Sequence, residues 1–380
     1  MAKQIDFLII GPAYPYRGGI ADTQHELASS LIKSNNSVIL YTFNKLYPDF
    51  IFPGKTQFNH ERFNYNLKIK RIIHSYNPLN WIKVARRINK LNPRTIIIRY
   101  FTPFLSPCYI NILKRVNGSI LKIALVDNWS PHEKRYTDKF LNNLLIKYVD
   151  GYLTLSNNVA LELNNNVNKP IYSGFHPINH KLPKQIKKSE ARKKLGWNLN
   201  DKIILFYGLI RNYKGLDILI KSLAEKPINN TNTRLAIIGE FYESIEKYKK
   251  MIGQLNLKNK IYLISNYADE KSTNFYFSGS DIVALTYKTA SQSGVIPLAY
   301  HYRKPILVSD LVGLKDPIIK DKSGEVSSHN PKEISAKLNQ MLRSENIKKY
   351  KKNIENSITN YSWKKYTDDM LYFINKLNSK

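Results

Sequence analysis

A chain of 380 residues is long enough for about two domains that each bury their own core, which excludes the small disulfide-stabilised scaffolds. Its composition, 43% hydrophobic and 23% charged with 16 Gly and 17 Pro, excludes collagen-like and wholly disordered chains. The 59 Lys and Arg against 29 Asp and Glu give a net charge of +30. This excess predicts an anionic partner: nucleic acid, an anionic membrane face or a phosphorylated small molecule.

The single cysteine, Cys108, excludes an intrachain disulfide and a cysteine-based metal cluster and favours a reducing compartment. The first apolar run, residues 7–10, is too short for a signal peptide, and no later run approaches the length of a membrane span. We therefore expect a cytoplasmic protein that does not cross a membrane.

The first half of the chain alternates short apolar runs with segments of helical periodicity. Residues 7–10 predict a buried strand, followed by a glycine loop that ends at Gly18 and Gly19 and an amphipathic helix over about 20–33. Further strands are predicted at 37–42, 95–99, 121–126 and 151–155. Strands that alternate with helices are typical of a parallel, doubly wound sheet.

The second half repeats this alternation after a polar, basic stretch over about 177–200. Its strands are predicted at 202–207, 234–238, 260–263, 281–286 and 305–308. The tail from 331 to 380 is predicted to be helical, with Trp363 anchoring its last helix against either domain. We therefore predict domains at 1–175 and 176–360 and a terminal helix at 361–380.

Ligands of doubly wound domains bind at the carboxyl ends of the strands, so the loops there hold the candidate site residues. The loop that ends at Gly18 and Gly19 can bring backbone N–H groups to a phosphate, or it is a tight turn. After the strand at 121–126 come Asp127, His132 and Glu133, where the histidine acts near a reacting centre or is merely solvated.

In the second domain, Arg211 and Lys214 precede a helix and form either a diphosphate clamp or a pair of solvated cations. Gly239 and Glu240 end a strand and can contact a base or a sugar. Small polar residues open the helix after the strand at 281–286 and suit an anion, although a serine there is also an ordinary N-cap: Gln292, Ser293, Gly294 and Val295. No metal-ligand spacing and no Gly-x-Ser-x-Gly elbow occurs, so neither a catalytic metal nor a hydrolase triad is expected.

One stretch, residues 62–126, contains no Asp or Glu but 13 Lys or Arg. Within it a basic amphipathic helix is predicted, and a helix of this kind can lie on an anionic membrane or pack as an ordinary solvated helix. The residues expected to touch the membrane are Trp81, Lys83, Arg86, Arg87 and Lys90.

Taken in order, the motifs resemble the family 4 glycosyltransferases of the GT-B fold, over nearly the whole chain. The segments that carry the resemblance are residues 16–20, 208–215, 239–240, 293–308 and 361–363, and residues 127–133 resemble a motif of a bacterial subset. The resemblance implies two Rossmann-like domains facing a cleft, with an N-terminal acceptor side and a C-terminal nucleotide-sugar side. The final helix is then expected to cross back to the N-terminal domain.

The resemblance also implies the chemistry. A sugar would pass from a nucleotide-diphosphate donor to a lipid-linked or polysaccharide acceptor in bacterial cell-surface glycan synthesis, with retention, without a metal and without a cofactor. Arg211 and Lys214 would hold the diphosphate, Gly18 and Gly19 would approach it, and His132 would lie beside the donor sugar. The enzyme is then expected to be peripheral on the inner face of the cytoplasmic membrane.

The chain departs from this family at one place. Two glutamates eight positions apart are usual there, whereas this chain has no acidic residue between Asp281 and Asp310. Gln292, Ser293 and the amides of Gly294 and Val295 are the expected substitutes. The alternatives are a nucleotide-sugar epimerase of the same fold, a basic nucleic-acid-binding protein and an inactive scaffold.

Overall fold

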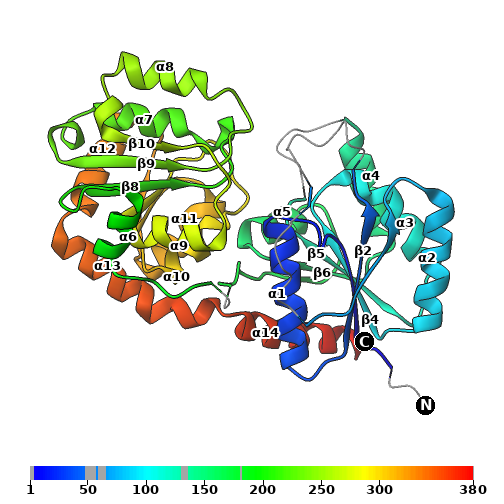
Figure 1. Cartoon of the computed structure of the whole chain (residues 1–380). Helices are drawn as coiled ribbons and strands as arrows, with labels where there is room; N and C mark the ends of the chain where they lie inside the picture. Colours follow the sequence, from blue (N-terminus) through cyan, green and yellow to red (C-terminus); the bar gives the residue numbers. More distant parts are fainter. Residues whose placement is uncertain (1–3, 48–56, 59–65, 130–135, 180–181, 380) are drawn as a thin grey trace. The chain divides into compact units, whose positions relative to one another are not determined.

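The computed structural model describes residues 4–47, 57–58, 66–129, 136–179 and 182–379. The chain divides into two compact units, one formed by Met1–Pro177 with Trp363–Lys380 and the other by Ile178–Ser362 (Figure 1). The chain passes from one unit to the other after residues 177 and 362, each two residues beyond the expected boundaries at 175 and 360.

The described part of the N-terminal unit holds a parallel sheet with the order β3-β2-β1-β4-β5-β6-β7. Its strands are β1 (Phe7–Ile10), β2 (Val38–Lys45), β3 (Ile69–His74), β4 (Thr95–Tyr100), β5 (Leu121–Val126), β6 (Gly151–Thr154) and β7 (Ile171–Tyr172). Its helices are α1 (Gly19–Lys33), α2 (Pro78–Leu91), α3 (Ser106–Leu113), α4 (Tyr136–Ile146), α5 (Asn157–Asn164) and α14 (Trp363–Asn378). The direction of winding reverses between β1 and β4, so the sheet is doubly wound.

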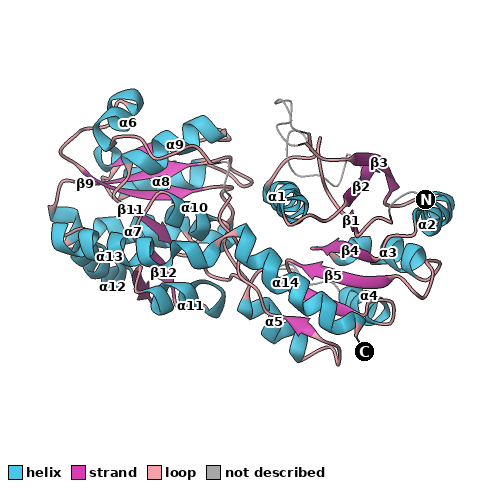
Figure 2. Ribbon diagram, turned by 90° about the horizontal axis from the view of Figure 1, so that it is seen from below, coloured by secondary structure: helices cyan, strands magenta, loops and turns pink. Residues whose placement is uncertain are grey.

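Both faces of this sheet are covered, which explains the continuous apolar run of β1. Leu8 and Ile10 join a core with residues of α2, α3, α4 and α5, whereas Phe7 and Ile9 join a second core with α1 and α14. Figure 2 shows α1 on one side of the strands and α2, α3 and α4 on the other. Strands buried on both faces have apolar side chains at every position instead of at alternate ones.

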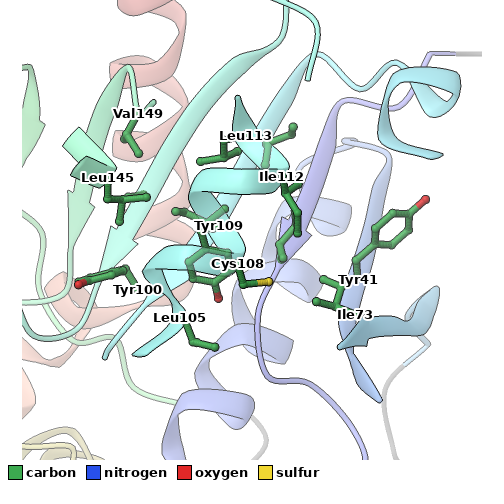
Figure 3. Close-up of a cluster of buried hydrophobic side chains, with 14 of the residues drawn as sticks. Tyr41, Ile73, Tyr100, Leu105, Cys108, Tyr109, Ile112, Leu113, Leu145 and Val149 are labelled. Atoms are coloured by element: carbon green, nitrogen blue, oxygen red, sulfur yellow. The ribbon is translucent and has the colours of Figure 1, made fainter. Parts of the chain in front are cut away.

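Cys108 lies within the first of these cores. Figure 3 shows it on α3 beside Tyr109, among apolar side chains of β2, β3 and α4. Burial raises the pKa of the Cys108 thiol well above its usual value, so the thiol stays protonated and acts as a small apolar side chain. The Tyr109 hydroxyl donates a 2.9 Å hydrogen bond to the carbonyl of Arg99 and ties α3 to β4.

The C-terminal unit is a second doubly wound domain, whose described strands follow the order β10-β9-β8-β11-β12-β13. The strands are β8 (Lys202–Tyr207), β9 (Thr233–Ile238), β10 (Ile261–Ile264), β11 (Ile282–Leu285), β12 (Ile306–Ser309) and β13 (Gly324–Ser327). The helices are α6 (Lys188–Leu195), α7 (Leu216–Ala224), α8 (Glu246–Gln254), α9 (Glu270–Gly279), α10 (Val295–His301), α11 (Val312–Asp321), α12 (Pro331–Met341) and α13 (Ser344–Ser357). Alternate residues of β8 join two cores, one with α7, α8 and α12 and the other with α9, α10 and α11. The predicted pair of Rossmann-like domains is confirmed.

Three strands are not predicted from the sequence: β3, β7 and β13. Each lies at an outer edge of its sheet. In β3 the side chains of Lys70 and Arg71 are exposed, and in β13 only Ser327 is fully buried. Because an edge strand leaves part of its surface in water, its sequence lacks the apolar run by which a central strand is recognised.

The tail contains α12, α13, a short 3₁₀ turn at Ile358–Tyr361 and α14, with breaks at residues 342–343 and 362. Trp363 is only 4% exposed and packs with Tyr366 and Met370 against α1 and the N-terminal sheet. The Ser30 hydroxyl donates to the Trp363 carbonyl at 3.1 Å, and the Tyr366 hydroxyl donates to the Thr154 carbonyl at 3.1 Å. These contacts anchor the last helix to the N-terminal unit.

Candidate functional site

The loops that follow β8 and β9 are in close contact at two glycines. Gly208 has φ 105° and Gly239 has φ 149°, and a Cβ atom on Gly239 would lie 1.9 Å from the carbonyl oxygen of Gly208. A side chain at position 239 is therefore excluded by sterics. The winding of this sheet reverses between β8 and β11, and open sheets of this kind bind ligands at that point. The loop after β8 is therefore expected to contact a ligand.

Arg211 and Lys214 lie on this loop, around the 3₁₀ turn η3 (Asn212–Lys214). The turn is held by the loop after β11, because a Cβ atom on Gly215 would lie 1.9 Å from the carbonyl oxygen of Thr286. The Thr286 hydroxyl also donates to the Gly215 carbonyl at 2.9 Å. The backbone carrying both cations is therefore fixed by its neighbours, so they do not lie on a freely solvated loop.

Lys214 is a buried lysine. It is 8% exposed, its Nζ lies 5.5 Å from the centre of the Tyr287 ring, and a Cβ atom on Gly208 would lie 3.1 Å from that Nζ. No carboxylate among the described residues forms an ion pair with it. Burial lowers the pKa of Lys214 from 10.5, and the charge of Arg211 lowers it further. A buried cation that no described carboxylate neutralises suits an anionic ligand.

Arg211 is half-buried, with its guanidinium 4.9 Å from the centre of the Tyr242 ring. The loop after β9 is joined to the same turn, because Ile210 N donates to the Glu240 carbonyl at 2.8 Å and Tyr242 N donates to the Ile210 carbonyl at 3.0 Å. The expected contacts Arg211, Gly239 and Glu240 therefore lie on two hydrogen-bonded loops at one edge of the sheet. Tyr242, which orients the arginine, was not predicted from the sequence.

The segment before α10 differs in part from the expected anion site. Ser293 is 8% exposed, and its hydroxyl accepts a 3.3 Å hydrogen bond from Val295 N. The Val295 amide is therefore already used by a serine turn, which lies just before the N-cap residue Gly294. Gly294 is exposed and Gln292 half-buried. Gln292 and the Gly294 amide stay predictions for ligand contact.

In the N-terminal unit, Gly18 precedes α1 with φ 105°, and no side chain caps the helix. A Cβ atom on Gly18 or Gly19 would meet no atom within 4 Å, so the space beside both residues is open. Uncapped backbone N–H groups at a helix start attract anions. The two glycines keep their predicted role as a phosphate contact.

Asp127, predicted as catalytic, is held by a buried arginine. Both of its carboxylate oxygens accept 2.6 Å hydrogen bonds from Arg99, one from Nε and one from Nη2. The Arg99 side chain is 1% exposed, and the Asp127 side chain is 6% exposed. A carboxylate bound in this bidentate way is suited to fixing the loop after β5 and not to transferring a proton. The role of Arg99 was not predicted from the sequence. Nothing in the sequence distinguishes this cation, which lies inside an apolar strand, from the many other basic residues.

The start of the loop after β5 is fixed at a second point. Trp129 is buried, and its carbonyl accepts a 2.8 Å hydrogen bond from Asn142 Nδ2. His132 and Glu133, the other two predicted catalytic residues, lie outside the described residues. Their predicted roles stay predictions.

The prediction for α2 is wrong at one residue. Trp81 is 7% exposed and its indole N–H donates to the His74 carbonyl at 2.8 Å, so it belongs to the core. Lys83, Arg86, Arg87 and Lys90 are exposed as expected. The exposed apolar side chain on this helix is Leu79, at 71% exposure. Helical periodicity identifies an apolar stripe but not which of its members the sheet covers.

The family model described as glycosyl transferases group 1 matches residues 187–360, which include Arg211, Lys214 and Gly239. An uncharacterized glycosyltransferase of Methanocaldococcus jannaschii is 27% identical over 242 residues, covering 60% of this chain and 59% of that protein. A D-inositol 3-phosphate glycosyltransferase of Corynebacterium aurimucosum is 25% identical over 158 residues, covering 40% of this chain and 37% of that protein. The chain thus matches less than two thirds of the length of either curated relative.

Solved structures resemble the whole chain. A sucrose-phosphate synthase from Thermosynechococcus elongatus has a TM-score of 0.77 at 13% identity and covers 98% of this chain and 99% of its own. Anabaena HepE in complex with UDP has a TM-score of 0.74 at 13% identity, with 98% of this chain and 100% of its own covered. At this identity the likeness establishes the fold.

Two doubly wound domains, with a cation-bearing loop at the switch point of the second, define a protein of the GT-B class. The solved structures give the chain the GT-B fold, and residues 187–360 match the glycosyl transferases group 1 model, to which the glycosyltransferase relatives add a partial likeness.

Proposed function

We propose that the protein transfers a sugar from a nucleotide-diphosphate sugar to a lipid-linked or polysaccharide acceptor in the synthesis of a bacterial cell-surface glycan. The observation that supports this most is Lys214, a buried cation without a described carboxylate partner beside Arg211 at the switch point of the second sheet. A diphosphate would neutralise the positive charge of this pair of cations. The HepE structure, which was solved in complex with UDP, supports the same ligand class.

In this proposal the diphosphate is the leaving group. Negative charge grows on it as the glycosidic bond breaks, and Arg211 and Lys214 stabilise that charge. Separately, the uncapped start of α1 at Gly18 and Gly19 is proposed as a phosphate contact of the N-terminal unit. Glu240 contacts the base or the donor sugar, and His132 lies beside the donor sugar. The N-terminal domain binds the acceptor, and the anomeric configuration is retained.

The first test is calorimetric titration of the protein with UDP, GDP, ADP and CMP. We expect one diphosphate to bind selectively and CMP, which has a single phosphate, to bind weakly. Arg211→Ala should remove the selective binding, whereas Arg343→Ala, an exposed arginine of the same domain, should leave it unchanged. If none of the four nucleotides binds, the proposed function is wrong.

Transfer is expected to need no divalent metal, because the two cations neutralise the leaving diphosphate themselves. We therefore expect EDTA to change the turnover number by less than about twofold, since charge stabilisation by fixed cations needs no added ion. The check is the initial rate of transfer before and after chelation. A loss of activity that Mg²⁺ or Mn²⁺ restores would contradict metal independence.

We also propose that the protein works as a peripheral protein on the inner face of the cytoplasmic membrane. Leu79, Lys83, Arg86 and Lys90 follow one another at helical spacing on α2, and all four are exposed. A stripe with one apolar and three basic side chains suits the surface of an anionic bilayer. None of the helices in the described ranges is both long and apolar enough to cross a membrane.

Replacing Arg86, Arg87 and Lys90 with Glu should release the protein from vesicles that contain anionic lipid. Each basic residue near such a surface is worth about 1 kcal/mol, so partitioning should fall on the order of 100-fold. The matched control replaces the exposed Lys249, Lys250 and Lys258 of the other domain with Glu. Co-sedimentation with vesicles measures both, and an equal fall in both variants would assign the effect to net charge and not to α2.

A further inference from the structure

The strand β10 lies at one edge of the C-terminal sheet and is only half covered. Among the described strands it has a single hydrogen-bonded neighbour, β9. All four of its side chains are half-buried, whereas those of the central strand β11 are fully buried. An edge strand of this kind can pair with an extended segment of another chain, because one row of its N–H and C=O groups is free.

The backbone of β10 is paired on one side. Gly239 N donates to the Ile264 carbonyl at 3.0 Å, so the backbone groups of Ile264 turn toward the end of β9. Successive residues of a strand turn their N–H and C=O groups to opposite sides. The backbone groups of Ile261 and Leu263 therefore turn to the outer side, where no described strand lies.

A groove with a volume of about 670 Å³ runs along this edge, lined by residues of α8 and β10 (Figure 1). Its apolar lining comes from Ile252 on α8 and from Ile261 and Leu263 on β10. Ile252 is 6% exposed, and the two strand residues are half-buried. The free row of backbone groups is thus next to a space that apolar side chains of a partner can fill.

Three exposed lysines border the same groove: Lys249, Lys250 and Lys258. Lys249 pairs with Glu246 at 2.8 Å, but the two side chains are 52% and 72% exposed, so this ion pair is weak. Neither Lys250 nor Lys258 forms an ion pair with a described carboxylate. Three lysines against one glutamate leave the groove with a net charge of +2.

This charge selects among the possible occupants. A second copy of the chain, paired edge to edge, would bring its own three lysines against these, and lysines at a sheet edge disfavour such self-pairing. A lipid headgroup would meet the lysines but has no row of amides for the backbone of β10. An extended segment with carboxylate side chains matches both the lysines and the backbone.

We propose that the groove beside β10 binds an extended acidic segment of a partner protein, which adds a strand to the edge of the sheet. Main-chain hydrogen bonds to Ile261 and Leu263 hold the segment, and its carboxylates pair with Lys250 and Lys258. None of these residues belongs to the candidate site around Arg211, so the inference does not depend on the proposed function.

The test is fluorescence anisotropy of labelled peptides titrated with the whole chain at physiological salt. We expect (Glu-Val)4 to bind saturably and (Lys-Val)4 not to bind. The peptide (Glu-Pro)4 has the same charge, but proline cannot donate to a sheet, so it should bind at least about tenfold more weakly. Hydrogen–deuterium exchange of residues 261–264 should slow when (Glu-Val)4 binds.

Charge reversal tests the lysines. Replacing Lys249, Lys250 and Lys258 with Glu should weaken (Glu-Val)4 binding at least about tenfold, because three attractive pairs become repulsive. The matched control replaces Arg86, Arg87 and Lys90 with Glu, which changes the net charge by the same amount and should leave the peptide affinity within about twofold. All six positions are exposed, so both variants are expected to fold.

Four results would overturn the proposal: (Glu-Val)4 does not bind, (Glu-Pro)4 binds equally well, the two triple variants lose the same affinity, or exchange at 261–264 is unchanged on binding. A variant of the three groove lysines that loses binding to anionic vesicles but keeps the peptide would make a lipid the occupant and also reject the acidic segment. Nucleotide titration of the same variants is expected to match the wild type, since the groove and the Arg211 loop share no residue.

Discussion

Lys214→Met is expected to weaken nucleotide-diphosphate binding while leaving the free protein more stable. A charge-assisted hydrogen bond to a phosphate contributes about 1.5–3 kcal/mol, so the affinity should fall roughly 10- to 150-fold. In the free protein the same side chain is 8% exposed, and burial lowers its pKa from 10.5. Replacing this desolvated cation by Met should raise the free energy of unfolding by about 1 kcal/mol.

Calorimetry and urea denaturation measure the two effects on the same preparations. Arg211→Ala should lower affinity by a similar factor without the gain in stability, because the arginine is half-buried and packs on the Tyr242 ring. Lys258→Met, at an exposed lysine, should change neither quantity. Tighter or unchanged binding in Lys214→Met would show that the lysine has a structural role only.

Arg99→Met is expected to cost about 3–5 kcal/mol of unfolding free energy, because it removes the cation that is paired with the buried carboxylate of Asp127. Asp127 is 6% exposed, so water cannot replace the two hydrogen bonds that Arg99 gives it. The double variant Arg99→Met with Asp127→Leu should recover most of this loss, since a buried ion pair and an apolar pair of similar volume are often close in stability.

Denaturant unfolding of the two single variants and the double variant completes a thermodynamic cycle. Lys364→Met is the matched control, because its ion pair with Asp368 is 82% and 48% exposed and should be worth less than about 1 kcal/mol. If the stable double variant keeps nucleotide affinity but loses turnover, the ion pair positions the loop that leads to His132. A double variant no more stable than Arg99→Met would mean that the two residues do not act as a pair.

The central strands were predictable because their physics is local. β1, β5 and β8 begin and end at the predicted residues, since a strand covered on both faces must be apolar at every position. The alternation with helices then leaves few topologies, because parallel strands need crossover connections. The glycine loops were also recognisable, and the structure adds the steric reason at Gly239, where a side chain would meet the backbone of Gly208.

The sequence by itself therefore determined the two doubly wound domains and the loops that bear the candidate residues. Only the tertiary structure decided that Trp81 is core and Leu79 is surface, that Arg99 neutralises Asp127, and that Lys214 is buried. Periodicity depends on neighbours along the chain, whereas burial and ion pairing depend on residues far apart in sequence. Arg99 and Asp127, on β4 and just after β5, meet only because those strands lie side by side in the sheet.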